Sequence, residues 1–166
     1  MKTNEMIKEV AERATDIIAV EGKKVSMKDV TAIMQAYSEC VIDNLTDNKE
    51  EKIRQWLLRE LREVYHYPTE LLEIEWKVQS FSQTGFADIA VMIYRNNRKV
   101  PYILAEVKQY QSGINHAEEQ LRSYMAVSPE TCYGIITDGN ELKIIDKTGT
   151  EIEDIPKFDF SMLASG

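Results

Sequence analysis

The sequence is poor in the residues that build disulfides, metal cages or export signals. Its 166 residues include only two cysteines, Cys40 and Cys132, and two histidines, His66 and His116. No CxxC or HxxxH spacing occurs, so neither a structural zinc site nor a disulfide framework is predicted. No apolar run reaches the roughly 18 residues that a membrane span needs. The N-terminus also lacks the apolar core and cleavage site of a signal peptide. We therefore expect a cytoplasmic protein that does not enter a membrane.

Positive charge is scarce as well. The chain has 20 Lys and Arg against 28 Asp and Glu, for a net charge of −8. This balance argues against a protein that grips nucleic acid over a broad basic face. It remains compatible with a metal-dependent phosphodiesterase, whose site is itself acidic. Such a protein either binds DNA weakly alone or relies on a partner to bind the DNA.

Hydrophobic residues make up 43% of the chain, which suits one globular domain with a small appendage. Apolar residues recur at helical spacing over 4–20 and again after Ser26 to residue 45. These two stretches predict a helical hairpin over residues 1–46, as a cap or a dimerisation element. We place the main domain at 47–154 and a tail without clear elements at 155–166.

Within the main domain, helical and alternating patterns succeed one another. The elements expected in chain order are a helix over 50–67 ended by Pro68, strands over 71–81, 86–94 and 101–108, a helix over 116–127 capped by Asn115, and strands over 132–138 and 141–146. Pro101 is expected at the first position of its strand, where proline is tolerated. The order predicts an α/β fold in which a mixed five-stranded sheet is flanked by helices. A meander of three strands is followed by a crossover.

The stretch GFADIAVMIYRNNRKVPYILAEVK, residues 85–108, reads as an apolar hairpin that nevertheless carries Asp88, Glu106 and Lys108. Strand alternation groups Asp88 with Ala90 on one face, and Glu106 with Lys108 on one face of the next strand. A turn at 96–98 sets Asp88 opposite Glu106 or Val107. In the first register, both carboxylates point to the same side and lie close together.

Two neighbouring carboxylates repel each other unless a cation lies between them. Mg²⁺ prefers oxygen ligands and commonly takes one or two carboxylates, water and substrate phosphate. A lysine on the same face could position or help deprotonate the attacking water, and could stabilise charge growing on a phosphate. The alternative is structural, because edge strands carry Glu and Lys to block aggregation and such a pair can simply be solvated.

Asp88, followed by Glu106-Val107-Lys108 on the next strand, resembles the PD-(D/E)XK nuclease superfamily. Residues 49–146 are similar to the N-terminal nuclease domain of the restriction subunit of type I restriction enzymes. The motifs that carry this resemblance are, in order, EEKIRQWLLRELREVYHYP, IEW, ADIAV, ILAEVK, EEQLRSY and YGIITDG. The sequence departs from the pattern in one way, because Gly85-Phe86-Ala87 precedes Asp88 and no proline stands before the Asp.

The resemblance implies a restriction-endonuclease-like fold and hydrolysis of DNA that depends on Mg²⁺ or Mn²⁺. Asp88 and Glu106 would hold the metal, and Lys108 would serve the attacking water. The first helix of such folds often supplies another carboxylate, which matches Glu51, with Glu50 as the fallback. The structural alternative for Glu51 is an acid in the first turn that complements the helix dipole.

Two further residues match the QxxxY element of this family, Gln120 and Tyr124. Gln120 would lie near the metal or a phosphate, and Tyr124 shares its helical face four residues along. The alternatives are an exposed polar residue for Gln120 and core packing for Tyr124. Glu75 is interpreted as structural unless it is paired.

The N-terminal helices also look like the helical half of HU-type DNA-bending proteins, although the β-arm of that family is missing. The expected partners are DNA, other subunits of a restriction system and a second copy of the chain through these helices. Two other functions stay open beside the nuclease. One is a catalytically idle nuclease-fold module that binds nucleic acid, and the other is an interaction protein that uses the helical hairpin.

Overall fold

The computed structural model describes residues 49–79, 84–109 and 112–163. The predicted hairpin over 1–46, and the dimer that it could form, lie outside these residues. The described part contains two α-helices, α4 (Lys49–Glu63) and α5 (Asn115–Ala126). Neither is long and apolar enough to cross a membrane.

Six strands form one mixed sheet, in which they neighbour one another in chain order. They are β1 (Leu72–Gln79), β2 (Thr84–Arg95), β3 (Arg98–Val107), β4 (Tyr133–Thr137), β5 (Leu142–Asp146) and β6 (Glu151–Ile152). Only β3 and β4 run parallel, and α5 connects them. The predicted meander and crossover are therefore confirmed. The predicted count of five strands was one short, because β6 is only two residues long and too brief to show alternation.

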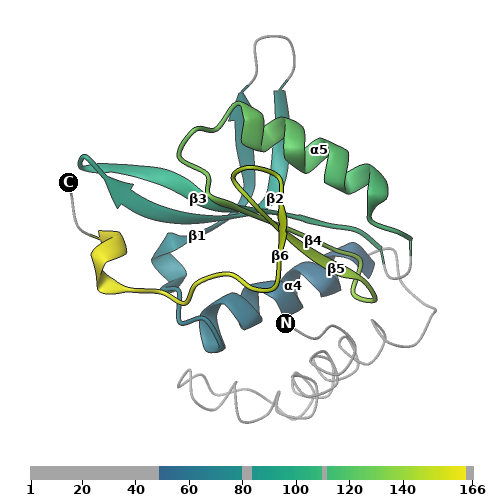
Figure 1. The fold of residues 1–166 in the computed structure, drawn as a ribbon. Helices are drawn as coiled ribbons and strands as arrows, with labels where there is room; N and C mark the ends of the chain where they lie inside the picture. The colour runs from purple at the N-terminus through teal and green to yellow at the C-terminus, as the bar shows by residue number, and fades with distance from the viewer. Residues whose placement is uncertain (1–48, 80–83, 110–111, 164–166) are drawn as a thin grey trace, which may run out of the picture.

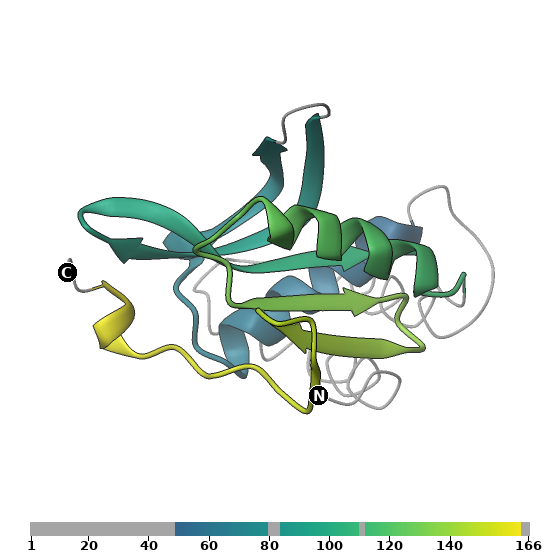
Figure 2. The ribbon, with the colours of Figure 1, turned by 45° about the horizontal axis from the view of Figure 1, so that its top comes forward.

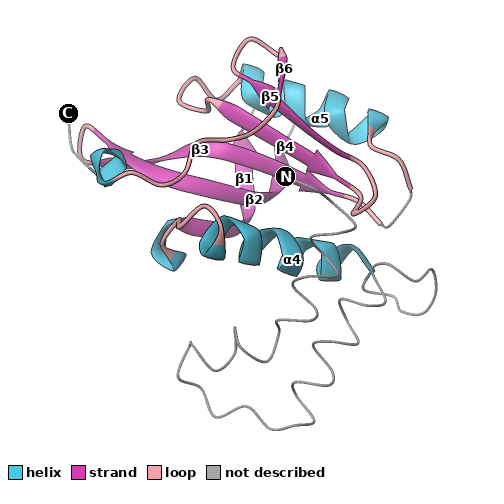
Figure 3. Cartoon of the chain, turned by 60° about the horizontal axis from the view of Figure 1, so that its bottom comes forward, coloured by secondary structure: helices cyan, strands magenta, loops and turns pink. Residues whose placement is uncertain are grey.

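The helices cover opposite faces of the sheet, as the two views in Figures 2 and 3 show. The apolar stripe of α4, which includes Ile53, Trp56 and Leu57, is fully buried against one face. Leu121 and Ala117 of α5 are buried against the other face. Gly134 of β4 lets α5 approach closely, because a Cβ there would lie 2.6 Å from Leu121 Cδ2. The sheet is thus the middle layer of three, and charged residues inside it need a specific reason.

Three element boundaries differ from the sequence prediction. Helix α4 ends at Glu63 rather than at residue 67. The helix cannot continue through His66, because this residue has a left-handed φ of 64°. The tyrosines on either side of it, Tyr65 and Tyr67, are both buried. Helix α5 is preceded by Ile114 without a side-chain cap, so Asn115 is not the capping residue. Pro101 lies inside β3 rather than at its start, beside a register shift between Val91 and Met92 of β2 that accommodates it.

The segment after β6, predicted to lack clear elements, packs against the body of the domain. It ends in a 3-10 turn, η2 (Phe160–Leu163). Phe158 donates its backbone N–H to the Tyr65 carbonyl at 2.8 Å and meets the Tyr67 ring edge-on. The Tyr67 hydroxyl donates to the Pro156 carbonyl at 2.7 Å. These contacts explain why both tyrosines are buried although the helix has already ended.

Candidate functional site

The structure brings the Asp and Glu of the hairpin together at the end of two central strands. The last paired residues of β2 and β3 at this end are Ile89 and Ala105, and one further step sets Asp88 opposite Glu106. Asp88 Oδ2 accepts the backbone N–H of Val107 at 2.8 Å. The backbone pairs of β2 and β3 end at Ile89 and Ala105. Beyond them, the Asp88 side chain accepts the next hydrogen bond from β3. The two registers left open by the sequence are resolved in favour of Glu106.

Both β1 and β2 kink at this point, which strict strand alternation does not predict. Ala87 and Ala90 belong to the same buried cluster beneath α5, although they are three residues apart. In β1, Trp76 packs on that cluster whereas Leu72 packs on the cluster beneath α4. The faces therefore switch within these stretches, and strict alternation does not hold along the whole of β2. The grouping of Asp88 with Ala90 on one face stays a prediction. In Figure 1 the ends of β1 and β2 beyond the kink rise from the sheet past α5.

Glu106 is the most deeply buried acid of the site. Its side chain is 2% exposed, and its Oε1 atom is buried without a hydrogen-bond partner. Burial first, and then the charge of Asp88, raise the pKa of Glu106 to about 9. Burial also raises the pKa of Asp88, while the N–H of Val107 opposes the shift. When both carboxyls are charged they repel each other, and a cation between them would relieve this repulsion.

Lys108 follows Glu106 by two residues and is half-buried at the end of β3. Its backbone N–H donates to the Thr137 carbonyl at 2.9 Å, which extends the parallel β3–β4 ladder by one bond. The charge of Lys108 lowers the pKa of Asp88, Glu106 and Glu50. The ammonium group is therefore an electrostatic neighbour of all three acids.

The first turn of α4 adds a third acid to this neighbourhood. Burial and then the charge of Asp88 raise the pKa of Glu50, and Lys108 opposes the shift. Glu50, the fallback of the sequence analysis, is thus an electrostatic neighbour of Asp88 and Lys108. The side chain of Glu51 lies outside the described part of the chain, so its assignment stays a prediction.

The QxxxY residues of α5 are joined to each other, and Tyr124 is an electrostatic neighbour of the same acids. Gln120 Nε2 donates to the Tyr124 hydroxyl at 2.7 Å. Burial raises the pKa of Tyr124, and the charges of Glu106 and Asp88 add to the shift. Gly85 makes room for the ring, because a Cβ there would lie 2.2 Å from the Tyr124 hydroxyl oxygen. Gly85, three residues before Asp88, thus has a packing role.

Sequence reasoning missed two residues in the surroundings of the site, Arg54 and Asp138. Arg54 of α4 forms an ion pair with Glu75 of β1, which the sequence left as structural unless paired. Asp138 is buried, and its Oδ2 accepts the N–H of Gly113 at 2.9 Å, which ties down the loop between Lys108 and α5. The signal for Arg54 was present, since it lies one helical turn after Glu50. The signal for Asp138 was the turn motif Asp-Gly-Asn, which was read only as a turn.

The residues present suit a divalent cation that keeps part of its hydration shell. Within residues 49–79, 84–109 and 112–163, no group of three or more His, Cys, Asp or Glu side chains could hold a metal by itself. Mg²⁺ does not require one, because it is commonly bound by one or two carboxylates together with water and phosphate. The orphaned Oε1 of Glu106 is an oxygen ligand of the kind that Mg²⁺ takes.

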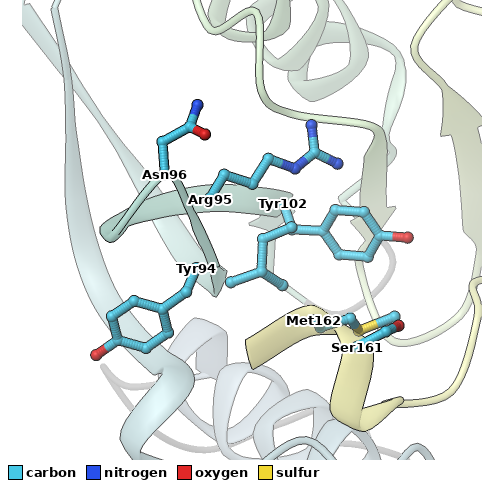
Figure 4. A pocket seen from close by; sticks show the side chains of 7 residues that line it. Tyr94, Arg95, Asn96, Tyr102, Ser161 and Met162 are labelled. Carbon is cyan, nitrogen blue, oxygen red and sulfur yellow. The ribbon is translucent and has the colours of Figure 1, made fainter. Parts of the chain in front are cut away.

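A separate pocket of about 520 Å³ lies at the other end of the β2–β3 hairpin, between the turn and η2. Tyr94, Arg95, Tyr102 and Met162 are among its lining residues (Figure 4). No acidic side chain lines it, and Tyr94 lies about 20 Å from Asp88 along β2 at ordinary strand rise. This pocket is unsuited to a cation and takes no part in the site.

A mixed sheet between two helices, with Asp, Glu and Lys at the ends of two adjacent central strands, defines a PD-(D/E)XK nuclease-like domain. The comparison with protein families agrees with this class. Residues 49–157 match the family described as "Type I restriction enzyme R protein N terminus", and the chain belongs to that family. No curated protein matches the chain.

Proposed function

We propose that this domain hydrolyses phosphodiester bonds of DNA with the help of Mg²⁺ or Mn²⁺. The observation that carries the proposal is the convergence of Asp88, Glu106 and Lys108, with one carboxylate oxygen of Glu106 buried and unpartnered. Membership of a restriction-enzyme family supports DNA as the substrate and other restriction subunits as partners.

In this proposal Asp88 and Glu106 hold the cation, and Glu50 is the nearest candidate for a third carboxylate. A bound divalent cation supplies Lewis acidity toward the scissile phosphate. Lys108 positions the attacking water and offsets the negative charge that grows on the phosphate oxygens. Gln120 orients the Tyr124 hydroxyl, which is an electrostatic neighbour of Glu106 on the α5 side.

The acidic character of the chain sets a limit on how this activity is used. With a net charge of −8, the chain gains little from long-range attraction to DNA. We therefore propose that a basic partner subunit presents the DNA to the domain. The isolated chain then cuts slowly, and the partner subunit makes most of the salt-dependent phosphate contacts.

Supercoiled plasmid DNA tests the activity. We expect nicking or cutting by the full chain with Mg²⁺ or Mn²⁺, and none with EDTA. Asp88→Asn removes the charge but keeps an oxygen that can accept the Val107 N–H, so the strand ends should hold while activity drops to background. The exposed Glu153→Ala is the matched loss of one acid away from the site and should cut like the wild type. Equal cutting by Asp88→Asn and wild type would show that the site is assigned wrongly.

Calorimetric titration with Mg²⁺ tests the metal site without requiring catalysis. We expect one Mg²⁺ per chain at this site, and loss of its binding heat in Glu106→Ala, because the buried oxygen ligands are then gone. Glu118→Ala is the control, since Glu118 is held by Arg122 and Lys143 instead. Saturable Mg²⁺ binding without any DNA cleavage would favour the idle nuclease-fold module over the enzyme.

A further inference from the structure

Glu75 holds an unusual backbone conformation in the middle of a strand. Its φ is 51°, in the left-handed region that residues other than glycine rarely adopt. It lies between the paired residues Ile74 and Trp76, whose partners on β2 are Ile89 and Ala87. Glu75 therefore stands opposite Asp88, where both strands kink. Strain of this kind persists only when surrounding contacts hold it, and it is concentrated at functional sites.

The Glu75 side chain forms an ion pair that connects the kink to α4. Its carboxylate accepts from the Arg54 guanidinium, whose side chain is only 15% exposed. Arg54 lies four residues after Glu50, so the two share one face of α4. Glu75 is also an electrostatic neighbour of both Asp88 and Glu50. The ion pair thus bridges β1 and the first turns of α4, beside the two acids that face Lys108.

The geometry points to Glu75 as a positioning residue, which acts through Arg54 to hold Glu50 of α4 against the Asp88–Glu106 pair. This inference rests on the proposed function, because its role is to complete the acidic site around the cation. The left-handed backbone aims the Glu75 carboxylate at Arg54. In this inference the organised site offsets the cost of the strained backbone.

Replacement of Glu75 separates the two roles, because a structural and a positioning residue respond in opposite ways. Glu75→Gly relieves the left-handed strain, so we expect the melting temperature of the full chain to rise by about 2 to 5 °C. The same change removes the carboxylate, so we expect at least tenfold slower plasmid nicking and at least threefold weaker Mg²⁺ binding. Glu75→Gln keeps the strain and loses the charge, and should lose activity without gaining stability.

The matched control is Asn97→Gly. Asn97 has a φ of 62° in the exposed β2–β3 turn, far from the acids. The Asn97→Gly variant should gain stability as Glu75→Gly does, and its plasmid nicking and Mg²⁺ binding should be unchanged. In a double-mutant cycle, Arg54→Gln and Glu75→Gln should not add, because either change breaks the same pair.

Two outcomes would overturn the inference. One is a Glu75→Gly variant with wild-type Mg²⁺ affinity, and the other is additive effects of Arg54→Gln and Glu75→Gln on that affinity. A wild-type chain that binds Mg²⁺ without cutting DNA contradicts the nuclease proposal alone, and the Mg²⁺ titrations then decide on Glu75. A wild-type chain that does not bind Mg²⁺ contradicts both.

Discussion

Lys108→Ala is expected to slow DNA cleavage by about 10² to 10⁴-fold, the range by which a positioned acid–base group usually contributes. Lys108 is the ammonium group that neighbours Asp88, Glu106 and Glu50 together. Its removal makes the net charge of the site more negative, so Mg²⁺ should bind as tightly as before or more tightly. Plasmid nicking rates and Mg²⁺ titration, measured on the same preparation, check the two halves of this expectation.

Lys143→Ala provides the control for loss of a lysine. Lys143 lies on β5, where its ammonium donates to both oxygens of Glu118 at 3.2 Å. The Lys143→Ala variant should cut at the wild-type rate, because Glu118 belongs to the outer face of α5. If Lys108→Ala cuts within twofold of the wild type, the lysine has no part in the chemistry. If Mg²⁺ binding is lost along with cutting, Lys108 supports the fold of the site instead.

Glu106→Gln is expected to stabilise the metal-free protein at pH 8 and to abolish its stabilisation by Mg²⁺. The pKa of Glu106 rises from its ordinary value of 4.5 to about 9, mainly through burial. A raised folded-state pKa means that Glu106 keeps its proton up to a higher pH in the folded chain than in the unfolded chain. The stability associated with the protonated acid is therefore complete below about pH 4.5 and is lost as the pH rises toward 9.

Glutamine cannot lose a proton in this way, so the variant should keep stability that the wild type loses. Leaving a buried polar group unsatisfied costs about 1 to 3 kcal/mol, and more for a charge, which sets the scale of the difference at pH 8. The difference should vanish near pH 4. Saturating Mg²⁺ should stabilise the wild type and leave the variant unchanged, because binding to the folded state alone raises stability.

Thermal unfolding between pH 4 and pH 9, with and without Mg²⁺, measures these effects. Glu118→Gln serves as a control of opposite sign. Hydrogen bonds from Arg122 and Lys143 lower the pKa of Glu118, so its contribution is present at neutral pH and is lost as the pH falls. Parallel stability curves for the wild type and Glu106→Gln across this range would contradict the assignment of Glu106 as the buried, unpartnered acid.

The sequence by itself determined the order of the main elements and the strands that carry the acids. Alternation over a few residues marks a strand, and helical spacing marks α4 and α5, because both patterns depend only on neighbours in the chain. The pairing of Asp88 with Glu106 did not follow in the same way. The two-residue turn at Asn96 and Asn97 alone would set Asp88 opposite Ala105, and the register shift between Val91 and Met92 moves its partner by one residue to Glu106.

Only the tertiary structure decided how the site is completed. The kink at Glu75 and Asp88, the ion pair from Arg54 and the nearness of Glu50 to Asp88 depend on contacts between residues more than ten positions apart. Local periodicity does not detect such contacts. The packing of Phe158 beside Tyr67 was hidden for the same reason. A left-handed residue in a strand and a tail without repeats carry no pattern of their own, because the surrounding fold imposes their conformations.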